Sequence, residues 1–132
     1  MSGENVDVVL RWIEAFNRRD SITASALWRS DAVADWSRAR GPFKGVYRGG
    51  RERVAFQEEF WSTFQYVHIE TYDVAETGSE VVVGNTAHMR GRDGIEVTAR
   101  STLVFTVENG QITHLRMFQE RAEALEAVGL RQ

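Results

Sequence analysis

The stretch that decides the fold, Glu80–Gln119, reads EVVVGNTAHMRGRDGIEVTARSTLVFTVENGQITHLRMFQ. It holds three apolar segments separated by Asp93-Gly94 and Asn109-Gly110, dipeptides that tolerate the positive φ angles of tight hairpin turns. In the middle segment, Ile95–Val107, inward and outward positions alternate as in a half-buried strand. The stretch therefore predicts three long antiparallel strands. Strands of this length twist, and the sheet they form curls and has a concave face.

The residues on either side of this stretch predict helices and shorter strands. Apolar residues at helical spacing predict a helix over about residues 5–17, a short one from Asp20 or Ser21 to about Trp28, and a third over about 51–63. Strands are expected over 31–37 and 66–75, and a turn-rich segment over 45–50. The order predicts an α+β fold, a cone-shaped roll. In it, a curved antiparallel or mixed β-sheet has about three N-terminal helices on its concave face and a short C-terminal helix after Gln119.

Length and composition narrow the classes of function. The 132 residues suffice for one domain, expected over 1–132, and the net charge of −3 argues against a nucleic-acid partner. The absence of cysteine excludes disulfides and thiolate chemistry. No apolar run approaches the roughly 20 residues of a membrane span, and Met1–Asp7 lacks a signal pattern. A cytoplasmic protein without a membrane partner is expected.

Three segments of the chain resemble a known superfamily. The run VVLRWIEAFNRRD at 8–20 resembles the first helix and turn of nuclear transport factor 2-like proteins, and GVYRG at 45–49 is similar to the entry of their third helix. FTVENGQITHLRMFQERAEAL at 105–125 is similar to the end of SnoaL-like polyketide cyclase domains. The resemblance covers nearly the whole chain and implies a single SnoaL-like domain. Because this superfamily hosts isomerases, cyclases, hydrolases and binders, it implies no one reaction.

Matching the residues of the steroid isomerase branch to this chain leaves one candidate for catalysis. The tyrosine of that branch falls on Trp12, its second aspartate on Leu103 or Thr102, and its general base, with a one-residue gap, on Asp35. Steroid isomerisation of that type is therefore rejected, and Asp35 is retained as the catalytic candidate. Beside bulky aromatic residues its pKa is expected to rise, as suits a general base. The alternative is a structural carboxylate that pairs with Arg38 or Arg40.

The remaining candidates are residues that bind a substrate inside the cone. If the resemblance sets the strand phase, the inward positions include a polar pair of groups, Asn85 and Arg116, among apolar ones. Arg116 could hold a carboxylate or an enolate oxygen, or it could pair with Asp35 or Glu120. A β-bulge would exchange the two faces. The predicted substrate-binding residues are Trp12, Phe16, Trp36, Tyr47, Phe56, Phe60, Asn85, Ser101, Leu103, Phe105, Arg116 and Phe118.

Charged residues and histidines give weaker indications. Arg38, Arg40, Lys44, Arg48, Arg51 and Arg53 form a basic cluster that could attract an anionic substrate or could be a solvated surface. His68, His88 and His114 show no ligand spacing, so no metal and no cofactor are expected. The outward residues of 98–106 are half apolar, which predicts a homodimer through the outer sheet face.

Three functions remain open at this point. The first is a cofactor-independent acid–base enzyme of the isomerase, cyclase, hydratase or hydrolase type, acting on a small, largely apolar molecule with a carbonyl or hydroxyl group. The second is a non-catalytic binder of small ligands, and the third is a dimeric interaction module with a filled cone. Of these three functions, the sequence slightly favours the enzyme. An open pocket would favour the first two, and a cone sealed by tryptophans the third.

Overall fold

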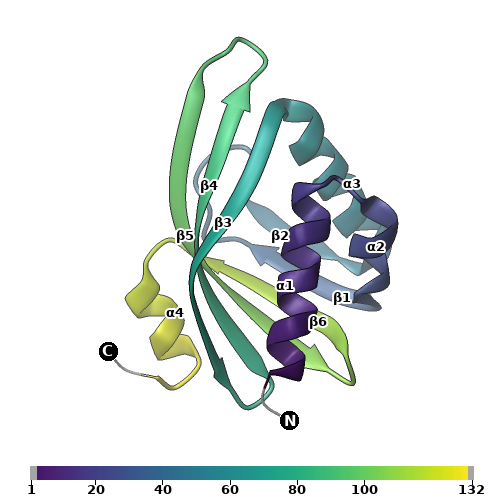
Figure 1. Cartoon of the computed structure of the whole chain (residues 1–132), viewed down its shortest axis with the longest axis vertical. Coiled ribbons are helices and arrows are strands. Elements are labelled where there is room, and N and C mark those ends of the chain that lie inside the picture. The colour runs from purple at the N-terminus through teal and green to yellow at the C-terminus, as the bar shows by residue number, and fades with distance from the viewer. Residues whose placement is uncertain (1–2, 131–132) are drawn as a thin grey trace.

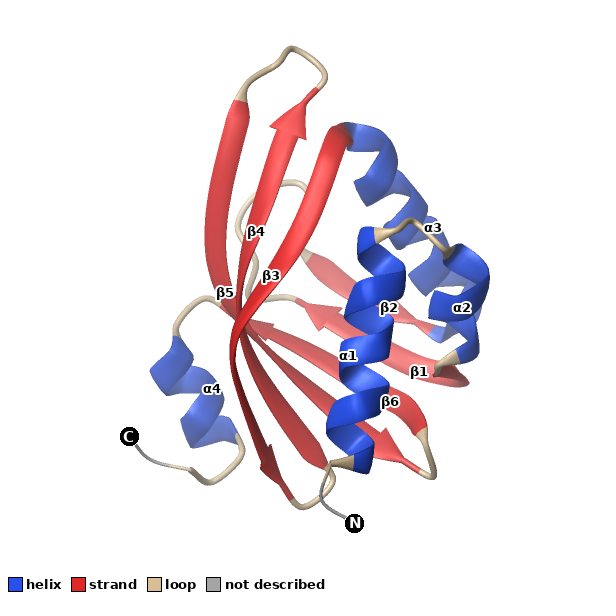
Figure 2. Cartoon of the chain, viewed as in Figure 1, coloured by secondary structure: helices blue, strands red, loops and turns tan. Residues whose placement is uncertain are grey.

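Six strands form one curved sheet, and helices α1, α2 and α3 lie on one side of it (Figure 1). The computed structural model describes residues 3–130. The strand order is β2-β1-β6-β5-β4-β3, in which β1 and β6 are parallel and the other neighbours antiparallel. In Figure 2 the elements are α1 (Glu4–Asn17), α2 (Ser21–Ala26), β1 (Trp28–Trp36), β2 (Gly45–Arg48), α3 (Gly49–Thr63), β3 (Phe64–Thr77), β4 (Glu80–Gly91), β5 (Glu96–Glu108), β6 (Gln111–Phe118) and α4 (Arg121–Ala127). The predicted α+β cone is confirmed.

Both predicted hairpin turns are present. At the first turn, Gly94 has a φ of 87°, and the carboxylate of Asp93 accepts a hydrogen bond from the backbone N of Ile95 at 3.1 Å. At the second turn, Asn109 and Gly110 have φ angles of 52° and 76°. These turns set three long strands side by side, and the β4–β5 hairpin extends beyond the helices (Figure 1).

Two segments differ from the expectation. Residues 45–48 form strand β2 instead of a turn-rich segment, because Gly45–Arg48 pairs antiparallel with the second half of β1. Strand β1 begins at Trp28, earlier than expected, since Trp28 already pairs with Ile112 of β6. Residues 29–32 follow as an irregular stretch that has no ladder partner on either neighbouring strand.

A β-bulge in β6 reverses the predicted phase of that strand. Val107 pairs with Ile112, but Thr106 pairs with His114, so Thr113 is an extra residue. Leu115 and Met117 consequently belong to the main core under the helices.

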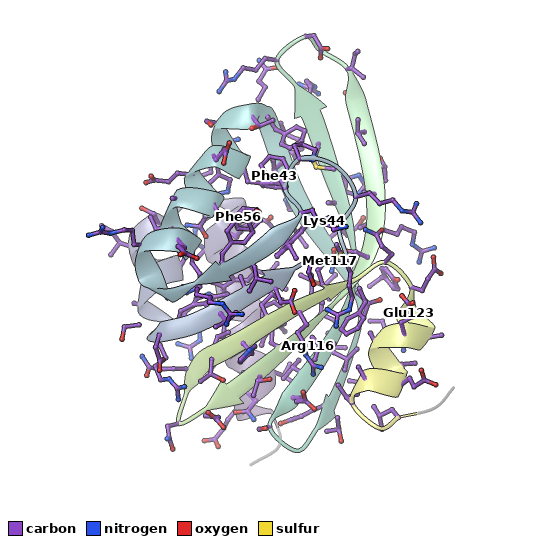
Figure 3. The ribbon with its side chains drawn as sticks, turned by 180° about the vertical axis from the view of Figure 1, so that it is seen from behind. Phe43, Lys44, Phe56, Arg116, Met117 and Glu123 are labelled. Atoms are coloured by element: carbon purple, nitrogen blue, oxygen red, sulfur yellow. The ribbon has the colours of Figure 1, made fainter. Side chains whose placement is uncertain are left out.

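The inward orientation predicted for Arg116 and Phe118 is therefore wrong. Phe118 packs in a second core with α4, and the guanidinium of Arg116 (Figure 3) donates to Glu80 at 2.5 Å. Both side chains lie on the outer face of the sheet, since cross-strand neighbours share a face.

The main core lies between the sheet and the N-terminal helices. Helix α1 buries Val9, Trp12, Ile13 and Phe16 on its sheet-facing side. At its end, the side-chain amide of Asn17 donates to the carbonyl of Ile69 at 2.9 Å and accepts from the backbone N of Ile69 at 2.7 Å. This reciprocal pair joins the end of α1 to the edge strand β3.

Helix α4 covers part of the opposite face. Ala124 and Leu125 pack on Val82, Val104 and Phe118 in the second core. The outward residues Val104 and Thr102, expected to be open to a partner, are only 0% and 1% exposed. The chain itself covers this apolar part of the face, and the homodimer stays a prediction.

Candidate functional site

A cavity lies on the concave face, enclosed by α1, α2, α3 and five strands of the sheet. The volume that the centre of a water molecule can occupy is about 90 Å³, several times what one buried water needs. The cone is therefore not completely filled by its own side chains.

Aromatic rings form much of the wall. Those that line the cavity are Trp12, Phe16, Trp28, Trp36, Phe56 and Phe60. Trp12 lies 5.4 Å from Phe16 and 5.6 Å from Trp28 between ring centroids, and Trp36 lies 5.5 Å from Phe56. Such tilted and edge-to-face pairs hold one another in position and leave a firm apolar surface.

Further rings support this wall from behind. Tyr47 stacks on Phe56 with a centroid distance of 4.1 Å and an interplanar angle of 8°. Phe43 meets Phe56 edge-on at 5.9 Å (Figure 3), and its carbonyl accepts a hydrogen bond from the Tyr47 hydroxyl at 2.8 Å. Tyr47 thus fixes the position of a lining ring without lining the cavity itself.

Asn85 and Ser101 place a polar pair on the sheet side of the cavity. They are direct cross-strand partners on β4 and β5, and Asn85 is only 2% exposed. The Asn85 carbonyl accepts from the Ser101 hydroxyl at 3.3 Å, and its amide nitrogen donates to the backbone carbonyl of Val83 at 3.4 Å. Both distances are long for hydrogen bonds. Within residues 3–130, the second N–H of the amide has no partner.

Arg53 and Gln57 place polar groups on the helical side. They are four residues apart on α3, hence on one face, and both line the cavity. The Arg53 guanidinium donates to the carbonyls of Ala32 and Arg29 at 2.9 and 3.0 Å. Burial lowers the pKa of Arg53, and the nearby charge of Asp31 opposes that effect.

Asp35 lies on the other face of β1. Its neighbours Ala34 and Trp36 both line the cavity, so strand alternation turns Asp35 away from it. Its carboxylate accepts from the backbone N and the hydroxyl of Ser37 at 2.9 and 2.6 Å and lies 3.6 Å from the Arg38 guanidinium.

The predicted rise in the pKa of Asp35 is wrong. Burial acts to raise this pKa, but the Ser37 hydrogen bonds and the Arg38 charge together lower it below its ordinary value. The alternative, a carboxylate that pairs with Arg38 and caps the following loop, describes the contacts found. Whether Asp35 takes part in chemistry stays a prediction.

Comparison with known proteins identifies the family. The model of the SnoaL-like domain matches residues 9–115. The chain belongs to the SnoaL-like family. Among functionally curated proteins, none matches the sequence.

Solved structures share the fold of this SnoaL-like chain. A nuclear transport factor 2-like protein of unknown function from Burkholderia pseudomallei is 23% identical, with a TM-score of 0.79 and coverage of 98% of this chain and 99% of that one. TerC crystallised with polyporic acid is 16% identical, with a TM-score of 0.79 and coverage of 96% and 98%. A Mycobacterium tuberculosis protein in complex with estradiol-17β-hemisuccinate is 14% identical, with a TM-score of 0.78 and coverage of 89% and 95%.

The cavity of the SnoaL-like chain gathers many of the predicted substrate-binding residues. Those that line it are Trp12, Phe16, Trp36, Phe56, Phe60, Asn85, Ser101 and Leu103. Tyr47 lies behind the wall, and Phe105 is fully buried in the core beside Trp12. Arg116 and Phe118 lie on the outer face.

The sequence reasoning missed the lining residues Trp28, Arg53 and Gln57 of this SnoaL-like chain. For Arg53 and Gln57 the signal was present in α3, where both share the helix face of the aromatic Phe60.

Within residues 3–130, no three histidine, aspartate or glutamate side chains are grouped as a metal ion would require. Over the same residues, no helix has the length and apolarity needed to cross a membrane.

Proposed function

We propose that this SnoaL-like protein binds a small, largely apolar ring compound that carries a carbonyl or hydroxyl oxygen. The observation that supports this most is the make-up of the cavity, where rings and aliphatic groups form most of the wall and the amide–hydroxyl pair of Asn85 and Ser101 lies among them. Pockets of this kind bind apolar ligands and orient them through a few polar groups. The spare N–H of Asn85 would donate to the oxygen of the ligand.

Binding without turnover is the reading we prefer. Among the described residues that line the cavity there is no aspartate, glutamate, histidine, lysine, tyrosine or cysteine. A general base must come within hydrogen-bond reach of the proton that it removes. Because Asp35 lies on the outward side of β1, we rank acid–base catalysis through it second. The small molecules held by TerC and by the mycobacterial protein on the same fold support the choice of a small ligand.

A matched pair of probes tests this proposal. 2-Acetylnaphthalene presents a carbonyl oxygen, and 2-ethylnaphthalene has nearly the same shape without one. At a hundredfold excess over Kd, a ligand stabilises the native state by about 2.7 kcal/mol, which raises Tm by several degrees. Binding is also measured by quenching of the tryptophans, because Trp12, Trp28 and Trp36 line the cavity.

The ketone should bind more tightly than the hydrocarbon in the wild-type protein. Asn85→Leu should weaken ketone binding by about tenfold, the loss of one hydrogen bond of about 1.4 kcal/mol, and should leave hydrocarbon binding nearly unchanged. Failure of both compounds to bind would refute the proposed function. Equal effects of the substitution on both compounds would refute the role of Asn85.

A further inference from the structure

Arg53 is, among residues 3–130, the charged side chain that lines the cavity. It also lines a second hollow on the adjacent surface, and Ser25, Trp28 and Val54 are common to both. Arg53 therefore stands between the interior of the cone and solvent. An ionic group bound there would keep one side close to water, which reduces the cost of desolvating it.

The guanidinium of Arg53 is already oriented. Its Nε donates to the carbonyl of Ala32 at 2.9 Å, one Nη donates to the carbonyl of Arg29 at 3.0 Å, and its carbon lies 4.7 Å from the ring centre of Trp28. Arginine has five N–H donors in a fixed fork. Within the described chain the other Nη has no partner, so donors remain for a ligand.

No carboxylate in the described part of the protein forms an ion pair with this guanidinium. Asp31 is near enough to act on Arg53 through its charge, but its carboxylate bonds to the Nε of Arg29 at 2.6 Å. Arg29 is also paired with Glu108 at 3.4 Å. Asp31 is thus paired with Arg29 and not with Arg53. A partly buried guanidinium without an ion-pair partner favours the binding of an anion.

Gln57 extends this polar site by one helical turn. Its side chain lines the cavity and makes no hydrogen bond to any described residue. An amide N–H beside a guanidinium is a suitable second donor to an oxyanion. By contrast Arg116, which sequence reasoning placed in this role, is paired with Glu80 on the outer face.

We propose that the ligand carries a carboxylate or a comparable oxyanion, and that Arg53, assisted by Gln57, binds this group at the helical wall of the cavity. The inference rests on the proposed function, because it names a further chemical feature of the same ligand. The ring system lies among the aromatic side chains, its neutral oxygen meets Asn85, and its anionic group meets Arg53. A structural role of Arg53, which donates hydrogen bonds to the carbonyls of Arg29 and Ala32, is the competing explanation.

Two compounds that differ in charge separate these explanations. 2-Naphthoate and 2-naphthamide have nearly the same shape, and their Kd values are measured by tryptophan quenching and calorimetry at pH 7. The wild-type protein should bind the acid at least about tenfold more tightly than the amide, as expected of a charge-assisted hydrogen bond. In Arg53→Gln this ratio should fall to about one while amide binding persists. In Arg53→Lys, which keeps the charge without the fork, the ratio should be intermediate.

Arg51→Gln is the matched control, because Arg51 lies two residues earlier on the same helix and is exposed. It should leave the ratio unchanged, and a fall in the ratio there would assign the effect to general surface charge and overturn the proposal. Equal binding of acid and amide by the wild-type protein overturns the proposal and leaves the proposed function intact. Binding of neither compound overturns the proposal, and the ketone and the hydrocarbon then decide separately on the proposed function. If Arg53→Gln does not fold, the ratio of acid to amide binding in the wild-type protein and in Arg53→Lys decides whether the proposal holds.

Discussion

Replacement of Asn85 by leucine should make the ligand-free protein more stable. Asn85 places an amide in an otherwise apolar part of the core, on β4 opposite Ser101. A polar group kept there without adequate partners lowers the stability of the fold, and such groups persist where they bind something. The sign of the change therefore separates a ligand-binding residue from a structural one.

The magnitude follows from the hydrogen bonds. Burying an amide costs about 1–3 kcal/mol unless its hydrogen bonds are replaced. The two contacts of Asn85, at 3.4 Å to the carbonyl of Val83 and 3.3 Å to the hydroxyl of Ser101, are long and recover only part of this cost. Leucine removes the polar atoms and keeps the same branched arrangement of four side-chain heavy atoms. We expect the free energy of unfolding to rise by about 1 kcal/mol and Tm by about 3–5 °C.

Urea unfolding with an unchanged m-value would measure the difference, and a thermal melt would confirm its sign. Ser101→Ala is the control, because it removes a hydrogen-bond partner and leaves the amide buried, which should lower stability. A loss of about 1 kcal/mol or more in Asn85→Leu would refute the reasoning. It would mean that the amide joins β4 to β5 and is retained for the fold.

Two more predictions concern residues outside the cavity. Asp35→Asn should destabilise the protein by about 1 kcal/mol at pH 7. The folded-state pKa of Asp35 is lowered, so its contribution is present above the ordinary pKa of about 3.9 and is lost as pH falls through the folded value. Urea unfolding at pH 7 and pH 3 should thus show a smaller loss at pH 3, and equal losses would contradict the assignment. Gly84→Ala would place a Cβ 2.9 Å from the Tyr72 ring on the outer face, and because this half-exposed ring can turn aside, thermal melts should show a small loss of at most about 1 kcal/mol. Tyr72→Ala in the same chain should restore part of that loss, and no restoration would exclude the clash as its cause.

The inward residues of β4 and β5 could be predicted because their pairing is regular. Each residue from Glu80 to Arg90 has one partner on β5, so the alternation in the sequence carries through to the faces of the sheet. Asn85 and Ser101 were found in this way. In β6 the extra residue Thr113 breaks the rule. The sequence contained one indication of this bulge. The apolar residues Ile112, Leu115 and Met117 are three and then two positions apart, whereas a regular strand would space them by two.

The positions of Asp35, outside the cavity, and of Arg53, on its wall, could not be predicted from the local sequence pattern. Asp35 sits beside bulky residues in the sequence, yet Ser37 and Arg38 supply contacts that outweigh burial. Arg53 belongs to a run of basic residues, and its separation from the others depends on the fold, which brings the carbonyls of the irregular stretch 29–32 within its reach. Both outcomes depend on which groups the fold brings near a charge, and residue type alone does not decide that.

Polar contacts attach two of the helices to the sheet around the cavity. Asn17 fixes the end of α1 to the edge strand β3 by two hydrogen bonds, and Arg53 fixes the start of α3 to β1 by two more. Between these attachments the side chains leave a volume of about 90 Å³ that the centre of a water molecule can occupy. An apolar molecule there would supply the contacts that the side chains lack. The unfilled, largely apolar space between the attached helices and the sheet is therefore favourable for a ligand.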